Sequence, residues 1–236
     1  MASAAGVRLG TNLMRPLVTV AAALLALTLS VAAALGEVAV YNNPFSTRAA
    51  IGDLQKVDGG NVCKRGWDKG ARELSLSIKK GSETCVFATP VHGDASQPNH
   101  QLDVEATVSK QVPKALRDKL FVAISVRNNQ STGYELRVVP GAGSWELRRD
   151  PEIDGFPMQG TNADAGLCKA NKLSLQAFDA SFTASINGEK VVDAFVDPSP
   201  GEVEGRRTTI AFGSEAEVKE GVAATFDDLA VLIPDP

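Results

Sequence analysis

The sequence feature that most constrains the fold is an Asn-Gly pair between two short runs of β-prone residues. Asn187-Gly188 follows residues 182–186 and precedes residues 189–195. A type I′ turn requires positive φ at both central residues, and Asn and Gly tolerate that conformation best. The run before this hairpin, 172–177, alternates apolar and polar residues with the period of a half-buried strand. We therefore expect antiparallel β-structure around this turn.

The same kind of run recurs along most of the chain. We expect strands at 73–79, 85–88, 102–108, 120–126, 134–138, 145–148, 172–177, 182–186, 189–195, 208–212 and 222–233. Short strands with a turn every 8–12 residues or so are typical of an all-β, two-sheet antiparallel jelly-roll sandwich. Residues 120–126 are apolar on both faces, which predicts a central strand.

The last of these runs changes face part-way. Its apolar residues occupy even positions up to Phe226 and odd positions from Leu229 onward. A strand changes face only where an extra residue is inserted, so we expect a β-bulge at Asp227-Asp228. Calcium needs several oxygen ligands, and we interpret this acidic pair as part of the bulge instead.

An apolar run near the N-terminus, residues 17–35, carries no charge. As a helix it would span roughly 28 Å, about the hydrocarbon thickness of a membrane. Arg15 precedes it and Glu37 follows it, so the positive-inside rule predicts a single-pass cell-membrane protein with a cytoplasmic N-terminus and residues 37–236 extracytoplasmic. The alternative is a signal peptide cleaved near Ala34 and a secreted protein, although the run exceeds the ~7–15 residues of a signal-peptide core.

These features divide the chain into three segments. Residues 1–36 are expected to hold a cytoplasmic stub and the transmembrane helix (or signal peptide), residues 37–62 a juxtamembrane segment, and residues 63–236 the sandwich. Ser46 or Thr47 can cap a helix, which predicts a short one over 48–56.

The charge distribution argues against nucleic acid as a partner. The 24 basic and 28 acidic residues include only Arg8 and Arg15 within the first 36, so the remainder carries a formal net charge of −6. Lys and Arg form no run longer than two. A mildly acidic domain of this kind lacks the basic patch that binds phosphates.

The chain has three cysteines. An exported domain favours disulfides, and Cys63 and Cys85 flank the expected strand at 73–79, so we expect them to be bonded. The odd count leaves Cys168, which we expect to be a small buried residue. No C-x-x-C pair is present, so a redox or zinc-ribbon function has no support.

Five stretches resemble a known superfamily. They are residues 131–149 (STGYELRVVPGAGSWELRR), 171–178 (NKLSLQAF), 182–191 (FTASINGEKV), 209–213 (TIAFG) and 224–232 (ATFDDLAVL). They are similar to concanavalin A-like lectins and glucanases, in particular to the laminin-G-like and keto-disaccharide-hydrolase-like domains of bacterial surface proteins. The resemblance covers about residues 100–233 and implies a jelly roll. Its motifs are fold motifs and do not specify a ligand.

Charged residues lie on or beside three of the expected strands. They are Arg127, Glu135, Arg137, Glu146 and Arg148. We expect them on the solvated face of one sheet. There they would either pair across strands, which stabilises a sheet by roughly 0.2–1 kcal/mol per pair, or line a polar ligand groove. Tyr134 and Trp145 have the opposite parity and are expected in the core.

The resemblance also raises the question of catalysis. Residues 152–154 (EID) resemble the start of the E-x-D-x-x-E element of family-16 glucanases, which implies a carboxylate nucleophile and an acid/base. Pro157 stands where the second Glu would be, so we expect no catalytic residues here. His92, Asp94 and His100 match no metal-ligand spacing, and we expect neither a metal nor a cofactor.

Three classes of function remain. The first is a membrane-anchored, non-catalytic module of the cell envelope that binds a glycan or an envelope protein. The second is a glycoside-hydrolase-like enzyme that acts on oligosaccharides through Glu152 and Asp154. The third is a purely structural ectodomain.

Overall fold

The Asn-Gly turn forms as the sequence predicts. In the computed structural model Asn187 has φ 54° and Gly188 has φ 82°, the signs that a type I′ turn requires. The turn joins β12 (Ser181–Ile186) to β13 (Glu189–Val196), which pair antiparallel. The Asn187 side chain accepts a hydrogen bond of 2.9 Å from the backbone N–H of Lys172. This bond connects the turn to the strand that precedes the hairpin, β11 (Asn171–Phe178).

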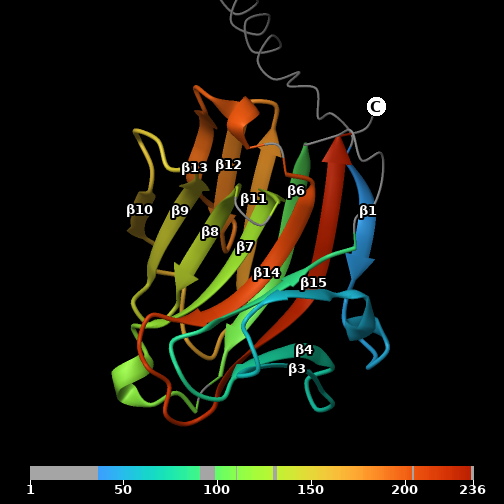
Figure 1. The fold of residues 1–236 in the computed structure, drawn as a ribbon, viewed down its shortest axis with the longest axis vertical. Coiled ribbons are helices and arrows are strands. Elements are labelled where there is room, and N and C mark those ends of the chain that lie inside the picture. The colour runs from blue at the N-terminus through green and yellow to red at the C-terminus, as the bar shows by residue number, and fades with distance from the viewer. Residues whose placement is uncertain (1–36, 91–98, 110, 130–131, 204, 235–236) are drawn as a thin grey trace, which may run out of the picture. The chain divides into compact units, whose positions relative to one another are not determined.

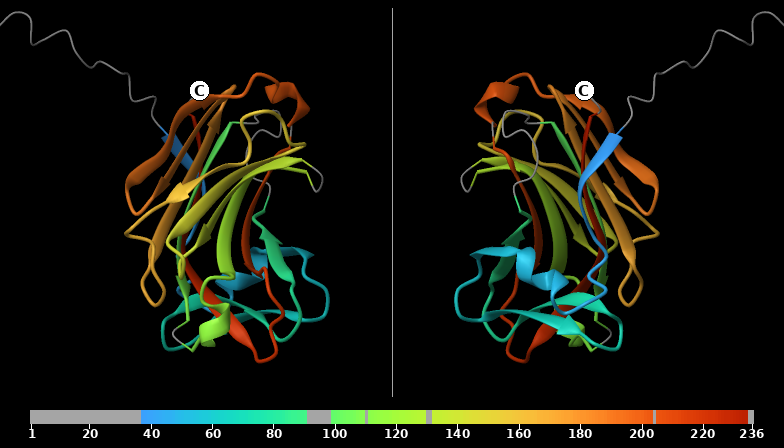
Figure 2. Two further views of the ribbon diagram at one scale, coloured as in Figure 1. Left: turned by 90° about the vertical axis from the view of Figure 1, so that its left-hand side faces the viewer. Right: turned by 90° about the vertical axis from the view of Figure 1, so that its right-hand side faces the viewer.

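The structure describes residues 37–90, 99–109, 111–129, 132–203 and 205–234, and these form two antiparallel sheets (Figures 1 and 2). The eight-stranded sheet contains β12, β13, β1 (Glu37–Asn43), β3 (Cys63–Asp68), β4 (Glu73–Ile78), β6 (His100–Val108), β11 (Asn171–Phe178) and β15 (Val222–Pro234). Its order is β13-β12-β11-β6-β15-β4-β3, and β1 also pairs with β15.

The second sheet has seven strands. They are β2 (Gln55–Asp58), β5 (Thr84–Ala88), β7 (Leu120–Asn128), β8 (Gly133–Val139), β9 (Ser144–Asp150), β10 (Met158–Thr161) and β14 (Arg207–Ser214). Their order is β10-β9-β8-β7-β14-β5-β2. Three short 3-10 helices complete the described part: η1 (Ala50–Asp53), η2 (Lys114–Leu116) and η3 (Pro200–Glu202). The two-sheet jelly-roll expected from the sequence is confirmed.

Alternate side chains of the two sheets meet in one apolar core. In β4 every second residue is buried, and Leu74, Leu76 and Ile78 are fully covered. Strand β7 is buried along almost its whole length, as expected of a central strand. Its inward residues join the main core, while Phe121 and Ala123 face outward and form a small second cluster. The second cluster marks the outer face of the seven-stranded sheet.

The bulge in β15 is confirmed. Pairing with β6 shifts register between Asp227 and Ala230, and Asp228 has φ 49°. Phe226 and Leu229, on either side of the acidic pair, are both buried. The inserted residue therefore lets the strand keep apolar side chains in the core across its change of parity.

Residues 37–62 differ from the expectation. They supply β1 and β2, one strand to each sheet, and residues 37–236 form one compact unit. Thr47 does accept a hydrogen bond from the N–H of Ala50, but the helix expected over 48–56 is only the 3-10 turn η1. The reason is tertiary, because β2 satisfies its backbone groups by pairing with β5.

The expected disulfide is confirmed. Cys63 in β3 is bonded to Cys85 in β5, with their Cα atoms 5.4 Å apart, so the bond links the two sheets. Cys168 is free and exposed, which corrects the expectation of a buried residue. It has φ 63° in the loop before β11, a position outside the alternation of any strand.

The expected membrane span, residues 17–35, and the alternative cleavage site near Ala34 lie outside the described residues. In the part of the chain that the structure describes, no helix has the length and apolarity to cross a membrane.

Candidate functional site

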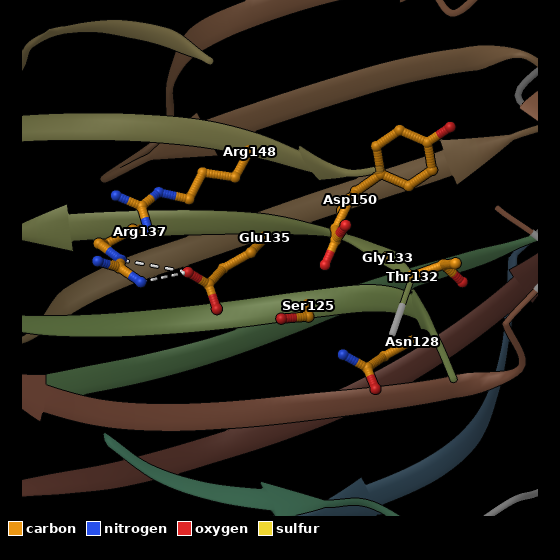
Figure 3. Close-up of a pocket in the computed structure, with 9 residues that line it drawn as sticks. Ser125, Asn128, Thr132, Gly133, Glu135, Arg137, Arg148 and Asp150 are labelled. Carbon is orange, nitrogen blue, oxygen red and sulfur yellow. Dashed lines mark hydrogen bonds and ion pairs between the residues drawn. The ribbon is translucent and has the colours of Figure 1, made fainter. Parts of the chain in front are cut away.

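The outer face of the seven-stranded sheet is hollowed where β7, β8 and β9 run side by side. Three hollows of about 250, 360 and 470 Å³ lie on this face. Arg148 lines all three, so they adjoin one another around its side chain. Figure 2 shows the strands of this sheet arching, and Figure 3 shows the side chains around the first hollow. We call this surface the β7–β9 face.

Four of the five charged residues expected on a sheet face lie together here. Arg137 donates to Glu135 at 2.9 Å along β8, and Arg148 donates to Glu146 at 2.6 Å along β9. Strand pairing also sets Glu135 opposite Arg148 and Arg137 opposite Glu146. The four residues therefore form a square of alternating charge, in which every side chain has an oppositely charged neighbour both along and across the strands.

Arg127 does not belong to this group, which corrects the expectation. It has φ 51°, next to a register shift in the pairing of β7 with β14, and its side chain turns inward and is buried. Its guanidinium donates to the backbone oxygen of Asp179 at 2.6 Å and lies 5.5 Å from the Phe182 ring centre. A bulge reverses the face of the residues beyond it, so parity counted from residues 120–126 fails at this position.

Sequence reasoning missed an aromatic contact on the β7–β9 face. Phe121 packs directly on Gly213 of the neighbouring strand, where an added Cβ would lie 2.1 Å from its ring. The guanidinium of Arg137 lies over the same ring, 3.8 Å from its centre. The only sequence feature that indicated this contact was the place of Phe121 in its strand. It lies between Leu120 and Val122, so its side chain points to the opposite face of the sheet.

Beneath the face lies a buried ionic network that the sequence did not reveal. Arg149 and Asp197 form an ion pair of 2.7 Å with both side chains fully buried. The hydroxyl of Tyr134 donates to the same carboxylate, and Arg149 also donates to the backbone oxygen of Ser199 at 2.8 Å and to Glu202 at 3.0 Å. The network joins β8 and β9 to the segment that follows β13.

The network shifts the pKa values of its members in opposite directions. Burial and the neighbouring Asp197 raise the pKa of the Tyr134 hydroxyl. Burial alone would raise the pKa of Asp197, but hydrogen bonds from Tyr134, Arg149 and the Ser199 backbone outweigh it and hold that pKa below its usual value. Asp197 is therefore a charged, hydrogen-bonded structural group at neutral pH.

Tyr134 and Trp145, the two aromatic residues expected in the core, differ in how far they are buried. Tyr134 is fully buried and packs against Phe182 with ring centres 3.9 Å apart. Trp145 is only partly covered; it packs against the core and lines the 470 Å³ hollow. Gly160 of β10 lies directly against its indole, where an added Cβ would come within 2.8 Å.

Comparisons with known proteins bear on the fold. The sequence matches no protein-family model and no curated protein. Among solved structures, a galectin-like-fold protein of unknown function from Bacillus subtilis is 13% identical, with a TM-score of 0.57 over 84% of this chain and 97% of that one. A Bacillus licheniformis β-glucanase is 11% identical, with a TM-score of 0.55 over 83% of this chain and 98% of that one.

A third similar structure is the Crh5 transglycosylase in complex with NAG. It is 8% identical, with a TM-score of 0.60 over 83% of this chain and 84% of that one. The chain has the concanavalin A-like lectin/glucanase fold. Because the identities are this low, the similarity establishes the arrangement of strands and not the ligand.

The catalytic alternative finds little geometric support in this concanavalin A-like sandwich. Glu152 lines the 360 Å³ hollow, but Asp154 lines none of the three. Both are exposed in the loop after β9. In none of these three hollows does the EID stretch bring its two carboxylates together, as retaining hydrolysis would require.

The three residues weighed as metal ligands do not form a described cluster. His92 and Asp94 lie outside the described residues, while His100 is buried in β6. The described residues contain no group of three or more His, Cys, Asp or Glu side chains that could hold a metal ion.

Proposed function

We propose that residues 37–236 form a non-catalytic glycan-binding module of the cell envelope and that residues 17–35 anchor it in the membrane. The observation that carries the glycan assignment is the β7–β9 face, a hollowed surface lined mostly by charged and polar side chains, together with the partly exposed Trp145. Hydroxyl-rich ligands need many hydrogen-bond donors and acceptors held in fixed positions. The two Arg–Glu pairs supply both, and their pairing holds them in place before a ligand arrives.

Rigidity supports the same proposal. Phe121 contacts both Gly213 and Arg137, and the buried Arg149–Asp197 pair holds β9 on its inner side. A face that is ordered without its ligand loses less conformational entropy on binding. Similar structures include a β-glucanase and a transglycosylase, so carbohydrate chemistry is found among proteins of this fold.

Anchoring and export rest on the N-terminal apolar run. The Cys63–Cys85 disulfide supports the export part of the proposal, since disulfides persist in oxidising compartments outside the cytoplasm. An alkaline-phosphatase fusion after residue 60 tests topology and should be active. Recovery of a soluble envelope form beginning near Leu35 would replace the anchor with a cleaved signal peptide.

Glycoside hydrolysis is the second candidate, because Glu146, Asp150 and Glu152 all line the 360 Å³ hollow. Catalysis would need two carboxylates free to act on the substrate, whereas Glu146 is held in an ion pair with Arg148 at 2.6 Å. We therefore favour binding over turnover. Oligosaccharide hydrolysis that Glu152→Gln abolishes would reverse this preference.

A glycan-array screen of the purified protein tests the proposed function. We expect binding to at least one glycan class and a loss of about tenfold or more in Arg148→Ala, because this side chain lines all three hollows. Arg48→Ala, which removes an exposed arginine that lines none of them, is the matched control. No binding to any glycan would favour a purely structural ectodomain.

A further inference from the structure

The 250 Å³ hollow at the end of β8 is lined mainly by side chains that carry oxygen. They are Ser125, Asn128, Thr132, Glu135 and Asp150, which surround the hollow from β7, β8, β9 and the β7–β8 connection (Figure 3). The two carboxylates only accept hydrogen bonds, the hydroxyl and amide groups both donate and accept them, and Arg137 and Arg148, which line the same hollow, only donate. The ligand group that this hollow selects therefore depends on which of these groups are already paired.

The two arginines at this hollow already have acidic partners. Arg137 is paired with Glu135 at 2.9 Å and with Glu215 at 3.7 Å, and it lies over the Phe121 ring. Arg148 is paired with Glu146 at 2.6 Å. Neither guanidinium presents an unbalanced positive charge, so the hollow has no free site for a carboxylate or sulfate group.

Several acceptor oxygens, in contrast, have no hydrogen-bond partner among the residues that the structure describes. Arg137 contacts only Oε1 of Glu135, and the other oxygen of this carboxylate points toward Ser125 (Figure 3). The Asp150 carboxylate points into the same space and makes no ion pair within the described residues. The buried Thr132 hydroxyl oxygen also lacks a hydrogen-bond partner among the described residues.

The surrounding charges reinforce this preference. Six carboxylates line the three hollows, those of Asp118, Glu135, Glu146, Asp150, Glu152 and Glu215. Among the residues that line the hollows, only Arg137 and Arg148 place a positive charge on the face. The third lining arginine, Arg149, forms its ion pair with Asp197 inside the sandwich. The face is thus net negative, which attracts cations and repels polyanionic glycans such as uronates.

We propose that the 250 Å³ hollow binds a protonated amino group and that the glycan recognised by the β7–β9 face carries free amino sugars. This inference rests on the proposed glycan-binding function and specifies its ligand. An ammonium group donates three hydrogen bonds, and bonds from a charged donor to a carboxylate are about twice as strong as neutral ones. Glu135, Asp150 and the Ser125 hydroxyl are placed to accept them.

Calorimetry with defined oligomers tests the inference. The probes are glucosamine hexamer, N-acetylglucosamine hexamer, cellohexaose and hexalysine, at a pH of about 5.5, which protonates amines and leaves carboxylates ionised. We expect the glucosamine hexamer to bind about tenfold more tightly than either neutral oligomer, with an affinity that falls as salt rises.

A matched pair of variants isolates the hollow. Asp150→Asn should remove most of the preference for the glucosamine hexamer over the two neutral oligomers. Asp154→Asn removes a nearby exposed carboxylate that lines none of the hollows and should preserve the preference. An unchanged preference in Asp150→Asn would overturn the assignment of this hollow.

The possible outcomes distinguish the amino-sugar inference from the glycan-binding function on which it rests. Equal or tighter binding of a neutral oligomer would refute the amino-sugar inference and leave the glycan-binding function intact. Binding of hexalysine as tight as that of the glucosamine hexamer would overturn the inference in favour of a peptide amine. Absence of binding to every saccharide would refute both.

Discussion

The guanidinium of Arg137 lies 3.8 Å from the centre of the Phe121 ring, and the same ring packs directly on Gly213. A cation over an aromatic face is stabilised electrostatically, by about 0.5–1 kcal/mol at an exposed site. Gly213 makes this stack possible, because only a residue without a side chain leaves room for the ring. Gly213 in β14 therefore contributes to the position of Arg137, two strands away in β8, together with the ion pairs of Arg137 with Glu135 and Glu215.

The first prediction concerns this stack. In Gly213→Ala the new Cβ would lie 2.1 Å from the Phe121 ring, so the ring must move and take Arg137 with it. Overpacking of this kind costs about 1–3 kcal/mol, which chemical denaturation would measure, and we expect weaker glycan binding as well. Gly66→Ala is the control, since its Cβ has no heavy atom closer than 4.0 Å. Equal midpoints for the two variants would contradict the packing described here.

The second prediction concerns the buried Arg149–Asp197 pair. Asp197→Ala leaves Arg149 buried without its main partner and should lower the free energy of unfolding by about 3–5 kcal/mol. Asp193→Ala removes a carboxylate from an exposed pair with Lys190 and should change it by less than about 0.5 kcal/mol. Urea denaturation of both variants at neutral pH makes the comparison.

The pH dependence of Asp197 follows from the direction of its shift. Its pKa is lowered in the folded state, so its stabilising contribution is present above the unfolded-state value, about 3.9, and is lost as pH falls through the folded-state value. The stability difference between the wild type and Asp197→Asn should therefore be large at pH 7 and shrink in acid. A constant difference down to about pH 2 would contradict the assignment.

The third prediction concerns Asp227, whose shift has the opposite sign. Burial, together with Asp228 and Glu105, raises its pKa, and its Oδ1 has no hydrogen-bond partner among the described residues. The folded state then favours the protonated form, so a cost appears as pH rises through the folded-state value. Asp227→Asn should stabilise the protein slightly at pH 7 and lose this advantage at low pH. Thermal unfolding at both pH values checks it, and a destabilised variant at pH 7 would refute it.

The fourth prediction concerns the cysteines. Loss of the Cys63–Cys85 bond in a double Ser variant should cost about 3 kcal/mol, because the bond closes a loop of 22 residues and links the two sheets. Cys168 is exposed and should react with a thiol reagent in the native protein. Mass analysis after native alkylation would find this one cysteine labelled. A bridge peptide that contains Cys168 would contradict the pairing.

The fifth prediction returns to the Asn-Gly turn. No heavy atom lies within 4 Å of a Cβ built on Gly188, so any cost of Gly188→Val comes from its φ of 82° and not from a clash. We expect a loss of roughly 1–2 kcal/mol, whereas Lys190→Ala, which removes only an exposed ion pair with Asp193, should stay within about 0.5 kcal/mol. Denaturation midpoints compare the two, and equal values would show that the turn carries no strain.

Part of the candidate site was accessible from the sequence. Alternation within β8 and β9 placed Glu135, Arg137, Glu146 and Arg148 on one outward face, because side chains in a strand point to opposite faces in turn. Alternation failed at Arg127, where positive φ and a register shift turn the side chain inward. Asp150, the free carboxylate of the proposed amine site, follows the same alternation and was overlooked because the strand was expected to end at 148.

The sequence by itself determined what depends on neighbours along the chain. These features are the turn at Asn187-Gly188, the alternating strands, the bulge at Asp227-Asp228 and the all-β class that follows from them. Each is encoded within about ten residues, by the φ preference of a turn residue or the parity of apolar side chains. The spacing of Cys63 and Cys85 also indicated their bond.

Only the tertiary structure decided the features that join distant residues. β1 and β2 become strands because β15 and β5 offer backbone partners, and the Phe121–Gly213 contact forms because β7 and β14 are neighbours in one sheet. The Arg149–Asp197 pair joins residues 48 positions apart in the sequence. Such contacts depend on the order in which strands are arranged, which no local pattern encodes, because parity determines the face of a side chain and not its cross-strand neighbour.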